Sequence, residues 1–219
     1  MTKLLIDFTL DSTTVSNPDG SLSTAFTGSS VVTGPGETII GTYPSALNLG
    51  TTGKASCNIS SILPNLKQFC INIVFSANGP VNSRQNLVES DMLPFSIFLA
   101  KGSTVNNCNL VTSVKPKNHN WNGPDTLFKK VLTLNKWYTI SLVYDFNTVA
   151  LFIDGELLSV HAFPDGNIEK QAGNKLFFGT WVDGARDHFN GKLAAFQLYD
   201  GIPDAFESLL DEQRDHAEW

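Results

Sequence analysis

The stretch KWYTISLVYDFNTVALFIDGELLSV, residues 136–160, decides the fold of this chain. Its first half places apolar side chains at every second position from Tyr138 onward, which is the side-chain period of a β-strand and not of a helix. A turn at Asn147 leads into a second apolar run. Asp154 and Gly155 then suit a tight hairpin turn, because glycine tolerates the positive φ that such turns require. We therefore predict antiparallel strands joined by short turns.

The same alternation recurs on the N-terminal side of residues 136–160 and predicts further strands. It occurs in LLIDFTLD (4–11), KQFCINIVFSA (67–77) and PFSIFLAKG (94–102), and the apolar runs KLFFGTW (175–181) and NGKLAAFQLYDG (190–201) are interpreted as two more strands. Segments rich in Gly, Pro, Asn and Ser separate these runs, so we expect about a dozen strands at the spacing of an all-β sandwich. The segment NGPVNSRQNLVESDML (78–93) is interpreted as a long polar loop.

The last segment, PDAFESLLDEQRDHAEW (203–219), follows a different pattern. Asp204 followed by Glu207 three residues later is typical of a capped helix start. Phe206, Leu209 and Leu210 form an apolar stripe at helical spacing. We therefore predict a short C-terminal helix after the last strand.

Composition and charge exclude several classes of protein. The chain has 219 residues, a length that suits one β-sandwich with a core that needs no disulfides. No repeat, linker or break in composition divides it, so we predict a single domain over residues 1–219. The net charge of −6 comes without a basic stripe, which argues against nucleic acid as a partner. No apolar run reaches the roughly 18 residues of a membrane span.

The N-terminus and the cysteines bear on the compartment of the protein. The opening MTKLLIDFTLDSTT (1–14) lacks the apolar region and cleavage site of a secretory signal. We expect a protein that is cytoplasmic, already processed, or exported by a route that needs no such signal. The three cysteines, Cys57, Cys70 and Cys108, do not suggest a disulfide framework, and we interpret them as small buried hydrophobic residues.

Residues 136–200 resemble a laminin G-like domain of the concanavalin A-like jelly-roll superfamily. The resemblance rests on KWYTISLVYD, VALFIDGELL, KLFFGT and FNGKLAAFQLYDG, with the helical tail IPDAFESLL and, earlier, GTYPSALNLG and FCINIVFSA. It implies an all-β, concanavalin A-like jelly-roll sandwich of two antiparallel sheets with a short C-terminal helix. It leaves the function open, because lectins, adhesion modules and polysaccharide-cleaving enzymes share this fold.

The segment WVDGARDHF (181–189) is the first candidate site. In the layout that the resemblance implies, it is a rim loop, and rim loops of this fold often bind ligands, frequently with calcium. We predict ligand contacts by Trp181, Asp183, Arg186 and Asp187. Calcium prefers six to eight oxygen ligands, of which Asp183 and Asp187 would supply some. The alternative is a solvated loop in which the Asp-Gly pair only turns the chain.

The segment KPKNHNWNGPDT (115–126) is the second candidate site. Trp121 stands between Asn120 and Asn122, and sugars present C–H faces that stack on aromatic rings and hydroxyl groups that pair with amides. We predict that these three residues bind ligand. The alternative is that Trp121 points inward and anchors a long loop.

An enzymatic reading depends on VESDMLP (88–94). Retaining β-glucanases of the superfamily carry an E-x-D-x-x-E strand motif whose outer glutamates are nucleophile and acid. Here the last position is Pro94, which cannot donate a proton and suits a central strand poorly. We therefore interpret Glu89 and Asp91 as loop acids and assign no catalytic residue.

These observations predict a non-catalytic, lectin-like domain that binds carbohydrate at its rim loops or over a sheet. Ring stacking on Trp121 or Trp181 would combine with hydrogen bonds from the Asn and Asp side chains, and calcium is compatible with the site but not required by it. Two alternatives stay open, namely an enzyme on the same fold and a protein-interaction module. Nothing in the sequence sets the oligomeric state.

Overall fold

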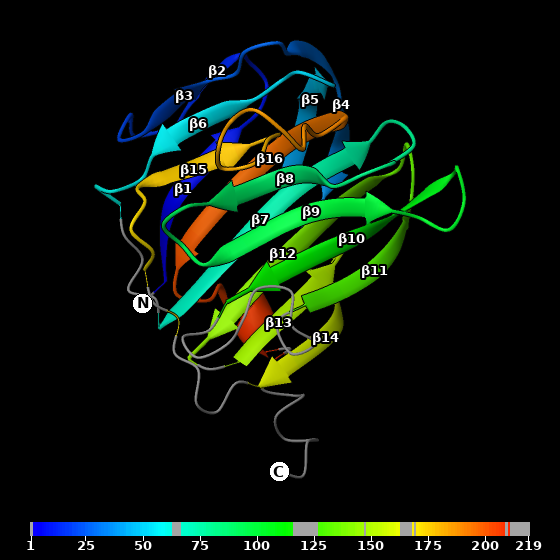
Figure 1. Ribbon diagram of the computed structural model, residues 1–219. Coiled ribbons are helices and arrows are strands. Elements are labelled where there is room, and N and C mark those ends of the chain that lie inside the picture. Colours follow the sequence, from blue (N-terminus) through cyan, green and yellow to red (C-terminus); the bar gives the residue numbers. More distant parts are fainter. Residues whose placement is uncertain are drawn as a thin grey trace.

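The protein forms two large antiparallel sheets that pack face to face, together with a small two-stranded sheet (Figure 1). The structure is a computed structural model that describes residues 2–62, 67–115, 127–146, 148–162, 168, 170–208 and 210. Figure 1 shows the six-stranded sheet in front of the eight-stranded one. The predicted jelly-roll sandwich is confirmed.

The eight-stranded sheet is built from strands of both ends of the chain. Its order is β14 (Glu156–Ala162), β13 (Thr148–Ile153), β12 (Trp137–Asp145), β7 (Gln68–Ala77), β16 (Gly191–Asp200), β5 (Gly41–Gly50) and β4 (Ser30–Thr38). The first strand, β1 (Lys3–Thr9), also pairs with β16. The final strand therefore lies between β7 on one side and β5 and β1 on the other.

The six-stranded sheet carries the face on which the candidate site lies. Its order is β11 (Leu127–Thr133), β10 (Asn107–Val114), β9 (Phe95–Lys101), β8 (Gln85–Ser90), β15 (Lys175–Phe178) and β6 (Ala55–Asn58). The small sheet pairs β2 (Thr14–Ser16) with β3 (Ser23–Ala25).

The core lies between the two large sheets, where the apolar side chains of alternating positions meet. Phe69, Ile71, Ile73 and Phe75 of β7 and Phe95, Ile97 and Leu99 of β9 are fully buried in one cluster. Burial of each such side chain contributes roughly 1.5–3 kcal/mol to folding. Because these residues face inward, Ser96 and Phe98 of β9 face outward.

The predicted turn and helix are both present. Asp154 and Gly155 adopt positive φ values of 51° and 86° between β13 and β14. The helix begins at Asp204, and its Phe206 packs 5.0 Å from the ring of Phe152. The three cysteines are free and buried, as predicted. In the part of the chain that the structure describes, no helix has the length and apolar character to cross a membrane.

Candidate functional site

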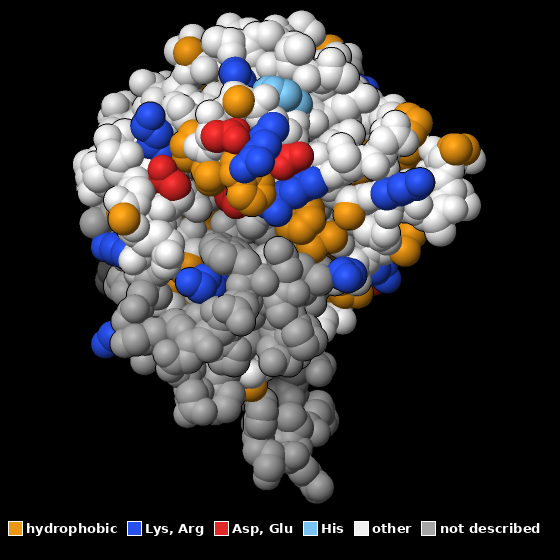
Figure 2. Space-filling view, viewed as in Figure 1, with side chains coloured by type: hydrophobic (Ala, Val, Ile, Leu, Met, Phe, Trp, Pro, Cys, Tyr) orange, Lys and Arg blue, Asp and Glu red, His pale blue; other side chains and the backbone are white. Residues whose placement is uncertain are grey.

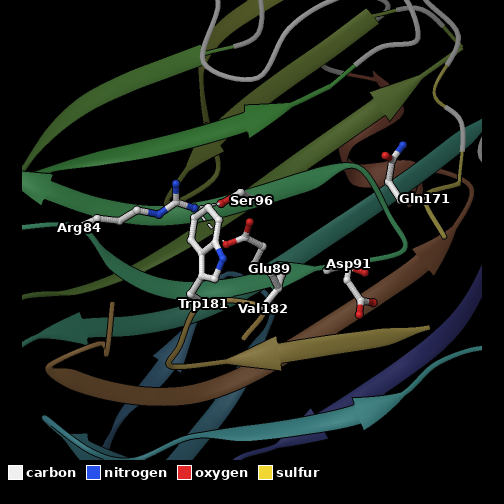
Figure 3. A pocket seen from close by; sticks show the side chains of 8 residues that line it. Arg84, Glu89, Asp91, Ser96, Gln171, Trp181 and Val182 are labelled. Atoms are coloured by element: carbon white, nitrogen blue, oxygen red, sulfur yellow. Dashed lines mark hydrogen bonds and ion pairs between the residues drawn. The ribbon is translucent and has the colours of Figure 1, made fainter. Parts of the chain in front are cut away.

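A cleft of about 310 Å³ lies on the outer face of the six-stranded sheet, where β8 and β9 meet the loop that follows β15. It is lined by Arg84, Glu89, Ser90, Asp91, Ser96, Gln171, Trp181 and Val182. Figure 3 shows Arg84 and Trp181 side by side near Glu89 and Ser96, with Asp91 and Gln171 further along the cleft. Figure 2 shows hydrophobic, acidic and basic side chains gathered at the middle of this face.

The polar floor of the cleft, formed by Glu89 and Ser96, continues across the sheet as a row that leaves the cleft at Ser113. Glu89 of β8 lies directly opposite Ser96 of β9, and Ser96 lies directly opposite Ser113 of β10. Directly opposed residues in a sheet point to the same face. The Ser113 hydroxyl is buried and has no hydrogen-bond partner among the described residues. The row therefore presents hydrogen-bonding groups at the spacing of adjacent strands, about 4.7–4.9 Å.

Arg84 is held rigidly over this floor. Its guanidinium carbon lies 3.9 Å from the centroid of the Phe98 ring and 4.1 Å from that of Trp181. The same group donates to Glu89 Oε2 at 3.0 Å and to Ser96 Oγ at 2.8 Å, while its Nε donates to Asn86 Oδ1 at 2.6 Å. Charge-assisted hydrogen bonds and cation–π contacts both favour this one position.

Glu89 and Arg84 form a largely buried ion pair. Glu89 is 7% exposed and also accepts a hydrogen bond from the side-chain amide of Asn86. Burial raises the pKa of Glu89, and the nearby Arg84 charge opposes this shift without cancelling it. Burial lowers the pKa of Arg84, against the attraction of Glu89 and Asp187. The cleft therefore contains a carboxyl group that gains a proton more readily than an exposed glutamate.

The loop of residues 181–188 is fixed by its own backbone and by the sheet. The Trp181 amide donates to the Arg186 carbonyl at 3.0 Å, and the Asn86 amide of β8 donates to the Asp187 carbonyl at 2.8 Å. Lys54 reaches the carbonyl of Gly184 from the β6 side. The loop is thus a packed part of the rim, and this is where the predicted residues of WVDGARDHF meet the cleft.

The structure brings the predicted loop residues together with Arg84. Trp181 lines the cleft, and the guanidinium carbon of Arg186 lies 5.1 Å from its ring centroid. Arg186 Nε also contacts Asp183 Oδ2 at 2.9 Å, with side chains that are 64% and 40% exposed. Asp187 adopts a positive φ of 55°. The other predicted residues, Asn120, Trp121 and Asn122, lie outside the described residues.

The calcium prediction for Asp183 and Asp187 stays a prediction. Asp183 already contacts Arg186 and accepts a hydrogen bond from the Ala185 amide at 2.9 Å. Over the residues that the structure describes, no group of three or more His, Cys, Asp or Glu side chains converges on one point. Calcium also accepts backbone carbonyl and water oxygens, so a titration is the test of this site.

The sequence interpretation missed the sheet side of the cleft. We interpreted residues 78–93 as a polar loop with Glu89 as a loop acid, and this is wrong, because Gln85–Ser90 is strand β8 and Glu89 lies on its outer face. A β-bulge between Asn86 and Val88 breaks the alternation that would have revealed the strand. Asp91 does follow the end of β8, where it accepts a hydrogen bond from the Lys175 amide at 2.7 Å.

Comparisons with solved structures show the fold. Domain 4 of AbnA, an extracellular arabinanase from Geobacillus stearothermophilus solved with arabinotriose, has a TM-score of 0.65 at 13% identity and covers 94% of this chain and 96% of its own. The binding domain of Paraclostridial Mosquitocidal Protein 1 has a TM-score of 0.64 at 16% identity, over 93% of this chain and 50% of its own. The binding domain of Botulinum neurotoxin DC, solved with rat synaptotagmin II, has a TM-score of 0.62 at 14% identity. That match covers 92% of this chain and 49% of the toxin domain. The chain thus spans about half the length of these two toxin domains.

Sequence comparison identifies the family. No curated protein sequence matches the chain significantly. The family model described as the concanavalin A-like lectin/glucanases superfamily matches residues 55–205, which is more than half of the chain and includes β8, β9 and the loop after β15. With the jelly-roll architecture and the strand motifs already described, this match shows that the chain belongs to the concanavalin A-like lectin/glucanase superfamily.

Proposed function

We propose that this protein is a non-catalytic carbohydrate-binding domain whose ligand lies in the cleft beside Trp181, over Glu89 and Ser96. The observation that carries the proposal is the fixed polar row beneath an aromatic side chain, on the rigid face of a sheet. Binding sites generally combine apolar or aromatic walls with a few well-placed polar groups. The likeness to an arabinanase domain solved with arabinotriose supports a saccharide as the ligand class.

The charges of the cleft favour a neutral sugar over an acidic one. Both nearby guanidinium groups already have carboxylate partners, Arg84 with Glu89 and Arg186 with Asp183. Two further carboxylates, Asp91 and Asp187, lie in the cleft or in its rim loop. An acidic ligand would therefore meet an excess of negative charge, whereas sugar hydroxyls can pair with carboxylate, hydroxyl and guanidinium groups alike.

The geometry suggests how such a ligand would bind. The Arg186 side chain is 64% exposed and that of Arg84 is 22% exposed. A sugar ring that stacks on Trp181 would therefore displace Arg186 and leave Arg84, which is held by Glu89 and Ser96, in place. Glu89 and Ser96 line the cleft from neighbouring strands, and Asp91 and Gln171 lie further along it (Figure 3). An oligosaccharide would contact more of these residues than a single sugar unit.

A glycan array probed once with calcium and once with chelator tests the proposal. We expect specific binding to neutral oligosaccharides that is lost in Trp181→Ala and retained in Phe146→Ala, which removes another exposed aromatic ring, outside the residues that line the cleft. Equal melting temperatures for the variants and the unmodified protein would show that both stay folded. A blank array, or binding that survives Trp181→Ala, would overturn the proposed site.

A second candidate function, hydrolysis of a polysaccharide, is favoured by one observation. Glu89 and Asp91 both line the cleft, and burial raises the pKa of Glu89 in the direction that a proton donor requires. Release of reducing ends that is abolished by Glu89→Gln would establish this activity. Binding without release of reducing ends would leave the lectin-like function as the answer.

A further inference from the structure

A second hollow, of about 320 Å³, lies on the outer face of the eight-stranded sheet. The outer faces of the two sheets point in opposite directions, so this hollow is remote from the cleft. It is lined by Ile39, Ile40, Asn72, Gly155, Gln197, Tyr199, Pro203, Ala205 and Phe206. Its floor comes from β7 and β16, and its walls come from the β4–β5 turn, the β13–β14 turn and the start of the C-terminal helix.

The floor belongs to a polar row that crosses four strands. Asp7 of β1 lies opposite Gln197 of β16, Gln197 opposite Asn72 of β7, and Asn72 opposite Ser141 of β12. The Asn72 amide donates to Gln197 Oε1 at 3.1 Å, and the Gln197 amide donates to Asp7 Oδ1 at 3.2 Å. Tyr199 donates its hydroxyl to the same Gln197 oxygen at 3.3 Å. The hydrogen bonds thus fix both amide groups in the floor.

This row retains capacity for further hydrogen bonds. A carboxamide nitrogen carries two N–H donors, and the described bonds use one on Asn72 and one on Gln197. Asn72 and Gln197 both line the hollow and are only 2% and 8% exposed. Buried polar groups in native structures usually have partners, so donors left over in a floor of this kind point to a ligand or ordered water above it.

The walls of the hollow are apolar and carry no charge on any of the nine lining residues. Ile39, which is 51% exposed, forms one side of the hollow and reaches the β13–β14 turn. A Cβ atom added to Gly155 in that turn would lie 3.5 Å from Cδ1 of Ile39. Pro203 and Phe206, at the start of the C-terminal helix, add further apolar side chains to the wall. A charged ligand would lose its hydration here without meeting an opposite charge, so the hollow suits a small neutral molecule.

We infer that this hollow is a second ligand site that takes a single neutral sugar unit. Adjacent hydroxyl groups on one edge of the sugar would accept from the Asn72 and Gln197 amides and pair with the Tyr199 hydroxyl. Its C–H face would lie against Ile39 and the helix. This site shares no lining residue with the cleft, so it can be tested independently of the function proposed for the cleft.

Ala205→Trp tests the site without touching its floor, because Ala205 is an exposed residue at the wall of the hollow. Glu207→Trp is the matched control, an exposed position on the same helix that does not line the hollow. The probes are the methyl glycosides of glucose, galactose, mannose and arabinose, and the readout is the NMR shift of the Asn72 and Gln197 side-chain amides.

We expect at least one probe to shift both side-chain amides in a saturable way in the unmodified protein and in Glu207→Trp. The shifts should be lost in Ala205→Trp and retained in Trp181→Ala, which separates this site from the cleft. Amides that stay unshifted with all four probes, or shifts that survive Ala205→Trp, would overturn the inference.

Discussion

The guanidinium carbon of Arg84 lies 4.1 Å from the centroid of the Trp181 ring, while the same guanidinium group donates to Glu89 Oε2 at 3.0 Å. One side chain therefore joins the sheet to the rim loop. The aromatic wall of the cleft and its acidic floor depend on each other through Arg84.

Arg84→Met is expected to destabilise the protein by about 3–5 kcal/mol, because it leaves the buried Glu89 carboxylate without its partner. The double change Arg84→Met with Glu89→Leu should recover most of this loss, since it removes both charges. Unfolding in urea, with the free energy extrapolated to water, measures both variants. A single variant as stable as the unmodified protein would show that the ion pair does not contribute.

The raised pKa of Glu89 predicts how the stability changes with pH. A carboxyl group whose pKa is higher in the folded state binds protons more readily when folded, so its contribution is fully present below the ordinary value of 4.5 and is lost as the pH rises through the folded value. The stability difference between the unmodified protein and Glu89→Gln should therefore fall over that interval. A difference that is flat with pH would contradict the assigned shift.

Gly155 should resist replacement by most residues. Its φ of 86° lies in the region that side chains with a Cβ rarely adopt, so Gly155→Val is expected to cost about 1–3 kcal/mol. Gly155→Asn should cost less, because asparagine visits this conformation more readily. Thermal unfolding compares the two. Equal losses would mean that contact with Ile39, and not backbone conformation, limits the position.

Calcium should raise the melting temperature if it binds the folded state through Asp183 and Asp187. At a free calcium concentration 100 times the dissociation constant, the expected stabilisation is about 2.7 kcal/mol. Asp187→Asn, which leaves the Asp183–Arg186 contact intact, should reduce this gain. An unchanged melting temperature at millimolar calcium would contradict calcium binding by Asp183 and Asp187.

The sequence was informative where one periodicity ran uninterrupted. The alternation in residues 67–77 and 136–146 predicted β7 and β12, because strands with one face in the core must repeat every two residues. The Asp154–Gly155 turn signal between two apolar runs predicted β13 and β14, whose pairing contains a bulge between Leu151 and Phe152. The alternation failed at β8, where the bulge before Val88 shifts it by one residue.

Only the loop side of the cleft was predictable from the sequence. Trp181 and its loop stood out because aromatic and charged residues are adjacent in the sequence. Their partners, Arg84, Glu89 and Ser96, come from a segment far from that loop in the chain, and no local pattern links residues that meet only through strand pairing.

The bulge between Asn86 and Val88 has a consequence for how this protein tolerates insertions and deletions. The bulge places Leu87 and Val88 in succession in the core, while Asn86 and Glu89 on either side of them bond to each other and to Arg84 on the outer face. Removal of Leu87 would leave Asn86, Val88 and Glu89 opposite Phe98, Ile97 and Ser96 in a regular ladder, with Glu89 still in the cleft. Strand β8 can therefore lose one residue at the bulge without exchanging its core and cleft faces, and a gap at this point in an alignment of relatives is compatible with an intact cleft.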